Sequence, residues 1–516
     1  MEKYRGLSPA EFFHRNREMA GFSNPVRALY QTVRELVENA LDATETHGIL
    51  PEIKVEIALD EERDNWVHVT VADNGIGIPL TEVPNVFGRV FYGSKYVIRQ
   101  TRGTFGLGGK MAVLHAQITT ARPIYVKSST LDARVSYEYR LYIDIGKNIP
   151  HIIGFRVRRK GRSKWHGTIV SLVTEGAWSQ ARRRIDEYIR RTALIAPYAT
   201  IIYRTPEGEV VYERASDKLP EPPQVGKHHP RGVDIEILKN MIRSLDEDIP
   251  LKDFLRRYFE SVGEKSAVEF LRWAGFDPET PIKSLGIRDL ERLANAMKRY
   301  GKWRRPRPIT LSPLGKDLLE QGARRILDPE FVAAVTRPPA SYGGHPFIVE
   351  AAVAYGGKIE PQNSPLLLRF ANRMPLLYDE GADVARKIVD SIDWSVYKVK
   401  FPAPLAVITH VCSTKLPFKS VGKEAIADVP EVEKELEIAI REVSRKLRQH
   451  LSRMERLHEV KRKEITIRKY IPEVSRSLSY VSGVEEATLK RKLEEMLERE
   501  IKKRGVVADA PLPKAA

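Results

Sequence analysis

The chain has 516 residues, of which 42% are hydrophobic and 30% charged, and this is typical of a folded protein with about three domains. Its apolar runs are much shorter than the ~18 residues of a membrane-spanning helix. The N-terminus lacks the apolar core of a secretion signal, and the single cysteine, Cys412, cannot form an internal disulfide. We therefore expect a cytoplasmic protein without a membrane anchor. The net charge of +17 favours a polyanionic partner, with nucleic acid first, over a basic surface that binds nothing.

The first 200 residues predict alternating helices and strands. A helix is expected over 23–43, with Asn24 as its N-cap and Pro25 in its first turn. Alternating apolar residues predict strands, and helical spacing predicts one further helix. The expected strands are 51–60, 65–73, 138–145, 151–158, 167–173 and a hairpin over 199–214, and the expected helix is 176–197.

Composition changes divide the rest of the chain. A Pro- and His-rich linker at 218–233 precedes a helical region at 234–305, and strands return over 310–425 around a helix at 381–392. A long charged helix is expected from 429 to 465, followed by a second charged helix near the C-terminus. The predicted domains are 1–228, 229–306, 307–466 and 467–516.

Four polar residues lie on one arc of the first predicted helix: Glu35, Glu38, Asn39 and Asp42. On these residues alone, a solvated helix face is the simplest interpretation. Asn39 is unusual, because asparagine is a mediocre helix former and its amide oxygen suits a hard cation such as Mg²⁺. Glu35, one turn earlier, would then be placed to accept a proton from water that attacks a phosphate.

Two glycine-containing loops follow. "VADNGIGIP" ends a strand at Asp73, and Gly75 and Gly77 would let the backbone approach a flat ligand whose amine Asp73 accepts; a plain turn is the alternative. "TRGTFGLGGKMAV", from Thr101, leads into an apolar helix and can present backbone N–H groups to phosphates. It fits neither the P-loop nor the dinucleotide fingerprint. Downstream, Gly167-Thr168 opens a strand, where a hydroxyl could support Asp73.

In this order and spacing, the four motifs resemble those of the GHKL ATPases, which include gyrase-type topoisomerases, MutL repair proteins, heat-shock chaperones and sensor histidine kinases. Segments 11–43, 86–117 and 370–384 are similar, more narrowly, to the B subunits of archaeal-type type IIB DNA topoisomerases. The similarity covers nearly the whole chain and thins after 465. It implies an α+β protein: a GHKL (Bergerat) ATPase sandwich, a helix-two-turn-helix insert, and a βαβ transducer domain with a long C-terminal helix.

The resemblance assigns roles in an ATP site. Glu35 would be the general base, Asn39 the Mg²⁺ ligand and Asp73 the adenine acceptor, while Glu38 has no role and is expected to be solvated. The remaining ATP-binding residues implied are Asp42, Gly75, Gly77, Gly103, Thr104, Gly106, Leu107, Gly108, Gly109, Lys110 and Thr168.

A transducer lysine is expected to contact the γ-phosphate. Lys415 is the candidate, with Lys419 and Lys423 as rivals and a surface lysine as the alternative interpretation. Gyrase-type relatives carry Gln-Thr-Lys at this place, whereas this chain has Ser413-Thr414-Lys415.

The resemblance also implies partners. Contacts to duplex DNA are expected from Lys160, Arg162, Gly286, Arg304 and Arg305. ATP would dimerise the ATPase domains, and a separate A subunit would cut the DNA in an A₂B₂ heterotetramer that passes one duplex through another, in the cytoplasm at the nucleoid. A MutL-like repair ATPase is the first alternative, although it leaves the helical insert unexplained. A heat-shock-type chaperone is the second, and the net charge disfavours it.

Overall fold

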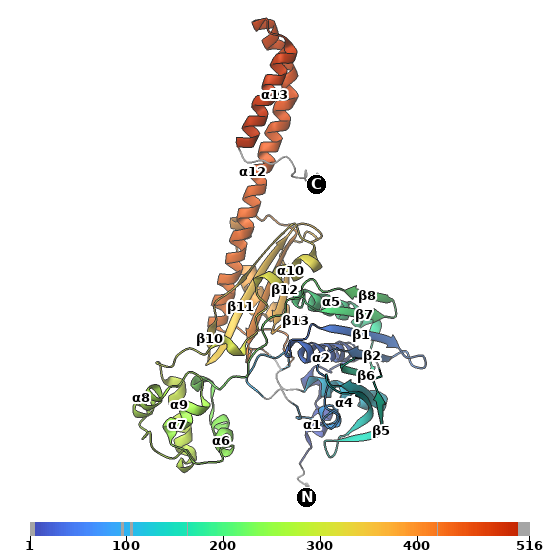
Figure 1. The fold of residues 1–516 in the computed structure, drawn as a ribbon, viewed down its shortest axis with the longest axis vertical. Helices are drawn as coiled ribbons and strands as arrows, with labels where there is room; N and C mark the ends of the chain where they lie inside the picture. Colours follow the sequence, from blue (N-terminus) through green and yellow to red (C-terminus); the bar gives the residue numbers. More distant parts are fainter. Residues whose placement is uncertain (1–5, 94–96, 104–106, 162–163, 420–421, 504–516) are drawn as a thin grey trace. The chain divides into compact units, whose positions relative to one another are not determined.

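The computed structural model describes residues 6–93, 97–103, 107–161, 164–419 and 422–503. Within it, the chain forms two compact units. Figure 1 labels the helices and strands. The first comprises Met1–Ile392 and Phe401–Val443, and the second comprises Asp393–Lys400 and Ser444–Ala516.

The N-terminal domain of the first unit is built on one large sheet. Its strands, in the order in which they pair among the described residues, are β5 (Ile149–Arg159), β4 (Val135–Asp144), β3 (Ile124–Ser129), β6 (Gly167–Glu175), β2 (Trp66–Ala72), β1 (Glu52–Leu59), β7 (Thr200–Thr205) and β8 (Gly208–Tyr212). Only the β1–β7 pair in this order is parallel. Buried and exposed residues alternate along β1, as expected for a strand with one face on the core. All the strands predicted in this region are confirmed, and β3 is an addition.

Helices cover one face of this sheet (Figure 1). They are α1 (Pro9–Arg15), α2 (Pro25–Glu45), α3 (Val83–Gly88), α4 (Gly108–Thr120) and α5 (Trp178–Ile195), with a short 3₁₀ turn η1 (Arg17–Ala20). Asn24 caps α2 as predicted, because its side chain accepts a hydrogen bond from the Arg27 N–H at 2.9 Å. Helix α2 packs against both α4 and α5 and thereby lies at the centre of the domain.

The region predicted to be helical at 234–305 is confirmed. Its elements are η2 (Pro230–Gly232), α6 (Ile235–Arg243), α7 (Leu251–Tyr258), α8 (Glu264–Ala274), η3 (Ile282–Ser284) and α9 (Ile287–Arg299). They enclose a hydrophobic core of their own around Phe254, Phe270 and Leu293, all fully buried. A separate core is what an inserted domain requires.

The transducer region contains the second sheet. Strands pair in the order β10 (Ala340–Tyr342), β11 (His345–Tyr355), β14 (Leu405–Ser413), β12 (Leu366–Ala371) and β13 (Met374–Leu376), and β9 (Phe331–Thr336) also pairs with β11. Its helical elements are η4 (Pro308–Thr310), α10 (Lys316–Leu327), η5 (Glu380–Ala382) and α11 (Val384–Ser391). Parallel β12 and β14 are joined through α11, which is the predicted βαβ arrangement. The sequence missed α10, which packs on β9, β11 and α5.

The long C-terminal helix α12 spans Pro430–Ser482, so the predicted end at 465 is wrong. The helix continues because charged side chains still pair one turn apart, as in Glu464–Arg468 at 2.9 Å. It ends where Gly483 adopts a φ of 72°. Helix α13 (Glu486–Lys503) follows, and the 3₁₀ turn η6 (Trp394–Tyr397) lies in the same unit. None of the helices in the described part of the chain has the length and hydropathy to cross a membrane.

Candidate nucleotide site

Glu35 and Asn39 of α2 lie against the first residues of α4. A Cβ atom placed on Gly108 would be 1.6 Å from the Glu35 Oε2 atom, and one placed on Gly109 would be 2.8 Å from the Asn39 Nδ2 atom. Only glycine therefore lets the beginning of α4 approach these two side chains so closely. The structure brings together four residues that the sequence singled out in two separate motifs.

Gln31 was not predicted, and it contacts Glu35 directly. Its Nε2 atom donates a hydrogen bond of 2.8 Å to the Glu35 Oε1 atom, and the Gln31 side chain is buried. The two residues are four apart, so they are neighbours on one face of α2. That spacing was visible in the sequence and could have pointed to Gln31.

Asp73 follows β2 and is buried against the start of β6. Its Oδ1 atom accepts hydrogen bonds from the Gly75 N–H at 2.8 Å and from the Thr168 N–H at 3.1 Å. Thr168 also accepts the Asp73 N–H through its backbone carbonyl at 2.9 Å. The predicted neighbourhood of Asp73 and Thr168 is therefore present, although the first contact comes from backbone and not from the threonine hydroxyl.

Burial raises the pKa of Asp73 to about 7, even though the N–H groups of Gly75 and Thr168 favour the ionised carboxylate. A perturbed carboxyl at a strand end beside a glycine loop is a typical mark of a functional site. An exocyclic amine that donates to the other oxygen would favour the ionised form.

Ser128, which the sequence did not identify, connects the loop after Asp73 to β6. Its hydroxyl accepts the Ile78 N–H at 2.9 Å, donates to the Gly167 carbonyl at 3.0 Å and lies 3.1 Å from the Thr168 hydroxyl. Gly77, with φ 72°, leaves no room for a Cβ, which would be 2.1 Å from the Ser129 carbonyl oxygen. The loop is therefore held tightly against β3.

The expected lid is described only in part. Thr104 and Gly106 lie outside the described residues, whereas Gly103, Leu107 and the beginning of α4 lie within them. The Lys110 side chain is buried, and its ammonium group donates to the Tyr92 carbonyl. The phosphate contact expected of Lys110 stays a prediction.

Arg102, which lies directly before the lid, was not predicted from the sequence to be a site residue. Its guanidinium binds both carboxylate oxygens of Glu45, at 2.7 and 2.8 Å, and the Asp42 Oδ1 atom at 3.1 Å. Asp42, predicted to help hold nucleotide, thus contacts the segment that leads into the lid. The arginine joins that segment to the end of α2.

Glu38 is not solvated, and the prediction of a wet residue is wrong. The side chain is 2% exposed and accepts a 2.8 Å hydrogen bond from the Arg34 Nε atom. Arg34 also binds Glu424 of the transducer region at 2.9 Å. A buried carboxylate needs a cationic partner. Arg34 is that partner for both Glu38 and Glu424, and Glu424 is far away in the sequence.

The three candidate lysines differ in their surroundings, and of these Lys423 is half-buried and has a φ of 56°. The Lys419 ammonium is 3.2 Å from the Asp428 carboxylate, which also binds Lys387. Lys415 is exposed, and within the part of the chain that the structure describes no carboxylate lies within ion-pair distance of its ammonium. Ser413 turns its hydroxyl to the Pro346 carbonyl at 2.9 Å and receives the Lys415 N–H at 3.1 Å, so it shapes the lysine loop from within.

A group of buried potential metal ligands lies in the second sheet, where Glu350, His410 and Cys412 meet. Hydrogen bonds already use both ring nitrogens of His410: Nδ1 contacts Glu350 at 2.7 Å, and Nε2 accepts the Arg373 N–H at 2.9 Å. Glu350 also accepts the N–H groups of Leu314 and Gly315, at 2.9 and 2.6 Å. The group is therefore a satisfied structural network and offers no free imidazole lone pair to a metal.

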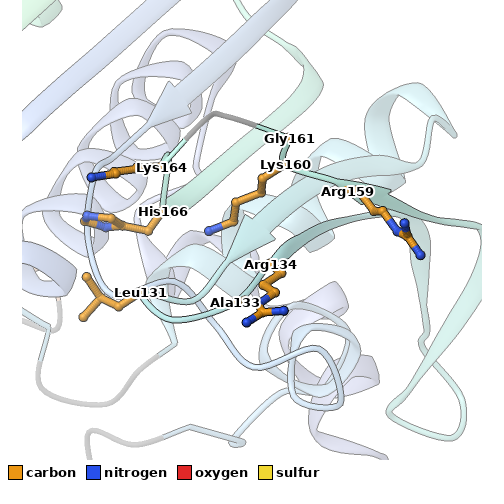
Figure 2. Close-up of a pocket in the computed structure, with 8 residues that line it drawn as sticks. All are labelled: Leu131, Ala133, Arg134, Arg159, Lys160, Gly161, Lys164 and His166. Carbon is orange, nitrogen blue, oxygen red and sulfur yellow. The ribbon is translucent and has the colours of Figure 1, made fainter.

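A basic pocket lies on the N-terminal domain next to the loop after Asp73. Figure 2 shows its lining before β4, at and after the end of β5, and before β6: Leu131, Ala133, Arg134, Arg159, Lys160, Gly161, Lys164 and His166. Of the two predicted DNA contacts here, Lys160 lines the pocket and Arg162 lies outside the described residues. The His166 ring donates from Nδ1 to the Gly75 carbonyl at 2.7 Å, so one residue borders both the pocket and the loop after Asp73.

The other predicted DNA contacts lie in or beside the helical domain. Gly286 is exposed and is the N-cap of α9, where backbone N–H groups are available to an anion. Arg304 and Arg305 are exposed in the segment that follows α9.

The α+β sandwich, with an acidic residue and an asparagine under a glycine-started helix and a buried aspartate at a strand end, defines a GHKL ATPase. A family model described as "Histidine kinase-, DNA gyrase B-, and HSP90-like ATPase" matches residues 24–137, and one described as "Topoisomerase VI B subunit, transducer" matches residues 306–463.

Named relatives cover nearly the whole chain. It is 54% identical over 501 residues to the B subunit of type 2 DNA topoisomerase 6 from Pyrobaculum aerophilum, a match that covers 97% of this chain and 95% of that protein. The protein of the same name from Metallosphaera sedula is 50% identical over 480 residues, with 93% and 90% coverage. The chain belongs to the family of type 2 DNA topoisomerase 6 B subunits.

Among solved structures, the Aquifex aeolicus MutL ATPase domain complexed with ADP matches 75% of this chain and 92% of its own, at 13% identity and a TM-score of 0.33. The agreement is too low to support any argument about function.

Proposed function

We propose that this chain is the ATP-binding and ATP-hydrolysing B subunit of a type IIB DNA topoisomerase, and that Glu35, Asn39 and Asp73 carry its nucleotide chemistry. The observation that supports these roles best is the approach of Gly108 and Gly109 to Glu35 and Asn39. A general base, an oxygen ligand and a helix N-terminus are thereby gathered where a triphosphate can be bound and attacked by water.

In this proposal Glu35 accepts the proton of the water that attacks the γ-phosphate. Gln31 donates a hydrogen bond to one carboxylate oxygen of Glu35 and thereby helps to orient this base. Asp73 accepts a hydrogen bond from the adenine amino group. The glycine-rich segment from Gly103 to Lys110 closes over the phosphates, and the first N–H groups of α4 contribute positive potential.

The residues present fit a magnesium ion. Asn39 is exposed beside α4 and offers an amide oxygen, the type of ligand that Mg²⁺ accepts while it retains waters and phosphate oxygens. Mg²⁺ held there would neutralise charge on the β- and γ-phosphates.

Lys415 is the lysine that we assign to the γ-phosphate. Its exposed ammonium has no carboxylate partner among the described residues, whereas Lys419 already has Asp428. Loss of this contact on hydrolysis would change the preferred state of the transducer.

The DNA substrate would be held through its phosphates. Four cationic side chains, Arg134, Arg159, Lys160 and Lys164, line one pocket, and Gly286, Arg304 and Arg305 add a second contact region. Phosphate contacts carry little sequence information, so binding should be nonspecific and salt-dependent.

The complete enzyme would be an A₂B₂ heterotetramer at the nucleoid, in which a separate A subunit cuts the duplex. ATP would dimerise the ATPase domains and thereby close a gate around a second duplex. The family membership supports this assembly.

The roles are tested with Glu35→Gln, which preserves the shape of the side chain but cannot act as a base. We expect nucleotide binding to remain, ATP turnover to fall by about 10²-fold or more, and strand passage in the presence of the A subunit to stop. Glu56→Gln, an exposed residue of β1, is the matched control and should behave like the native chain. Unchanged turnover in Glu35→Gln would remove Glu35 as the base.

A further inference from the structure

The turn between β12 and β13 is formed by Asn372 and Arg373, and both residues have positive φ angles, 48° and 63°. Such two-residue turns favour Asn followed by Gly, so an arginine at the second position is an unfavourable choice for the backbone alone. The turn is fixed to the neighbouring strand β14, because the Asn372 N–H donates to the Val411 carbonyl and the Arg373 N–H donates to His410. Side-chain contacts must therefore explain why these two residues stand here.

The Asn372 side-chain amide forms hydrogen bonds with both backbone polar groups of Ser413, the last residue of β14. Its Oδ1 atom accepts the Ser413 N–H at 2.9 Å, and its Nδ2 atom donates to the Ser413 carbonyl at 2.9 Å. The second hydrogen of Nδ2 is directed to the Thr101 carbonyl at 3.1 Å. One side chain thus ties the end of β14 to Thr101, two residues before the lid.

Arg373 makes a parallel connection to α2. Its guanidinium lies 3.3 Å from the Glu45 carboxylate and donates to the Tyr198 hydroxyl at 3.2 Å, in a buried environment. The same Glu45 carboxylate binds Arg102 next to the lid. The turn therefore contacts the helix that carries Glu35 and also the segment that enters the lid.

Ser413 is two residues from Lys415, and its hydroxyl accepts the Lys415 N–H at 3.1 Å. Through Ser413, Asn372 therefore fixes the point at which the chain leaves β14 and continues to Lys415. The lysine side chain has a limited length, so the position of its backbone sets which phosphates lie within its reach.

We propose that Asn372 is a positioning residue for ATP hydrolysis, which sets Lys415 in register with the lid by clamping Ser413 against Thr101. The inference rests on the proposed role of Lys415 at the γ-phosphate. Asn372 does not touch the nucleotide in this scheme. It sets the backbone from which the γ-phosphate contact is made, and it leaves the adenine contact of Asp73 untouched.

The test is Asn372→Gly in the full chain, because glycine accepts the positive φ without strain and removes only the amide. ADP affinity should stay within about twofold of the native value, while affinity for a non-hydrolysable ATP analogue and the turnover number each fall by about tenfold. Asn372→Asp keeps the acceptor for the Ser413 N–H but loses both donated bonds, and it should not restore the analogue affinity. The matched control is Asp328→Gly, another position with positive φ in the same domain, remote from the loop, and it should leave both affinities unchanged.

Equal losses of ADP and analogue affinity in Asn372→Gly would overturn the inference, because they would show a general effect on the site. Native behaviour of Asn372→Gly would overturn it as well. Lys415→Ala, measured in parallel, tests the underlying assignment separately: if it keeps the native preference for the analogue over ADP, the proposed role of Lys415 fails. A loss of that preference in Lys415→Ala, together with its retention in Asn372→Gly, would reject the clamp and leave the lysine assignment standing.

Discussion

Arg34 and Glu424, 390 positions apart in the sequence, form a buried ion pair with an N–O distance of 2.9 Å. Arg34 precedes Glu35 in α2, and Glu424 follows the loop that carries the candidate lysines. Asn372 binds Ser413 before the loop that carries the candidate lysines, and Arg34 binds Glu424 after it. Both ends of this loop are therefore held by residues that contact elements of the proposed nucleotide site. In the proposed site, this loop is therefore mechanically coupled to α2 and to the segment before the lid.

Removing the arginine should destabilise the protein strongly. Arg34→Ala leaves the carboxylates of Glu38 and Glu424 buried without their cation, and we expect a loss of about 3–5 kcal/mol in the free energy of unfolding. Denaturant titration of the full chain measures it. Arg15→Ala, which breaks an exposed pair with Glu11, is the control and should change little. A similar midpoint for both variants would show that the buried pair contributes nothing.

Nucleotide affinity should depend on pH through Asp73. Its pKa is about 7 in the free protein, and the adenine amino group needs the ionised carboxylate as its acceptor. Binding should therefore be tightest above pH 7 and should weaken as the pH falls through 7, with a limiting slope of about tenfold per pH unit. Calorimetric titration with ADP between pH 5.5 and 8.5 measures the profile. Asp73→Asn should bind weakly and without this slope, and a native profile without any slope would contradict the assignment.

The same carboxyl should lower the stability of the nucleotide-free protein. Because the folded-state pKa lies above the ordinary value of 3.8, ionisation opposes folding: the penalty begins as pH rises above 3.8 and is complete above 7. Asp73→Asn removes this penalty and should raise the free energy of unfolding at pH 8 by up to about 4 kcal/mol. At pH 4 the variant and native chains should unfold at nearly the same denaturant concentration. A destabilised variant at pH 8 would show that the carboxylate is needed for the fold.

Gln31 should affect turnover more than binding, since it touches the proposed base and not the nucleotide. Gln31→Leu should lower kcat by about tenfold with little change in KM, because Glu35 loses the donor that fixes its orientation. Gln31→Glu, which places a second carboxylate 2.8 Å from the first, should be no better. Steady-state ATPase assays separate the two constants. A rise in KM alone would assign Gln31 to binding.

Gly108→Ala and Gly109→Ala should differ, although they are neighbours. A methyl group at 108 would occupy the position of the Glu35 carboxylate, whereas one at 109 meets only the Asn39 amide at 2.8 Å. We expect Gly108→Ala to lose turnover by about 10²-fold with a normal thermal midpoint, because the side-chain end can move but not remain in place. Gly109→Ala should lower turnover less than Gly108→Ala does. Equal activities would mean that α4 does not approach Glu35 in solution.

Structural features that depend on neighbouring residues were predicted correctly from the sequence. The N-cap Asn24, the strand ending at Asp73 and the helix after the glycine-rich loop each follow from adjacent residues. Gln31 was missed although it lies one turn from Glu35. The pairing of Arg34 with Glu424 and the contacts of Arg102 and Asn372 could not be predicted, since each joins segments separated by dozens to hundreds of positions, whereas Glu38 pairs with Arg34 only four positions away. Helix α10 was missed in a region assigned to strands. The roles of Glu35, Asn39 and Lys415 stay predictions.

The hydrogen bond from His166 to the Gly75 carbonyl has a thermodynamic consequence. His166 lines the basic pocket, and Gly75 belongs to the loop that also donates to Asp73. If a phosphate of DNA in the pocket shifts this loop and changes nucleotide affinity by some factor, nucleotide must change DNA affinity by the same factor. A measurement of either binding reaction in the presence of the other ligand would then determine both.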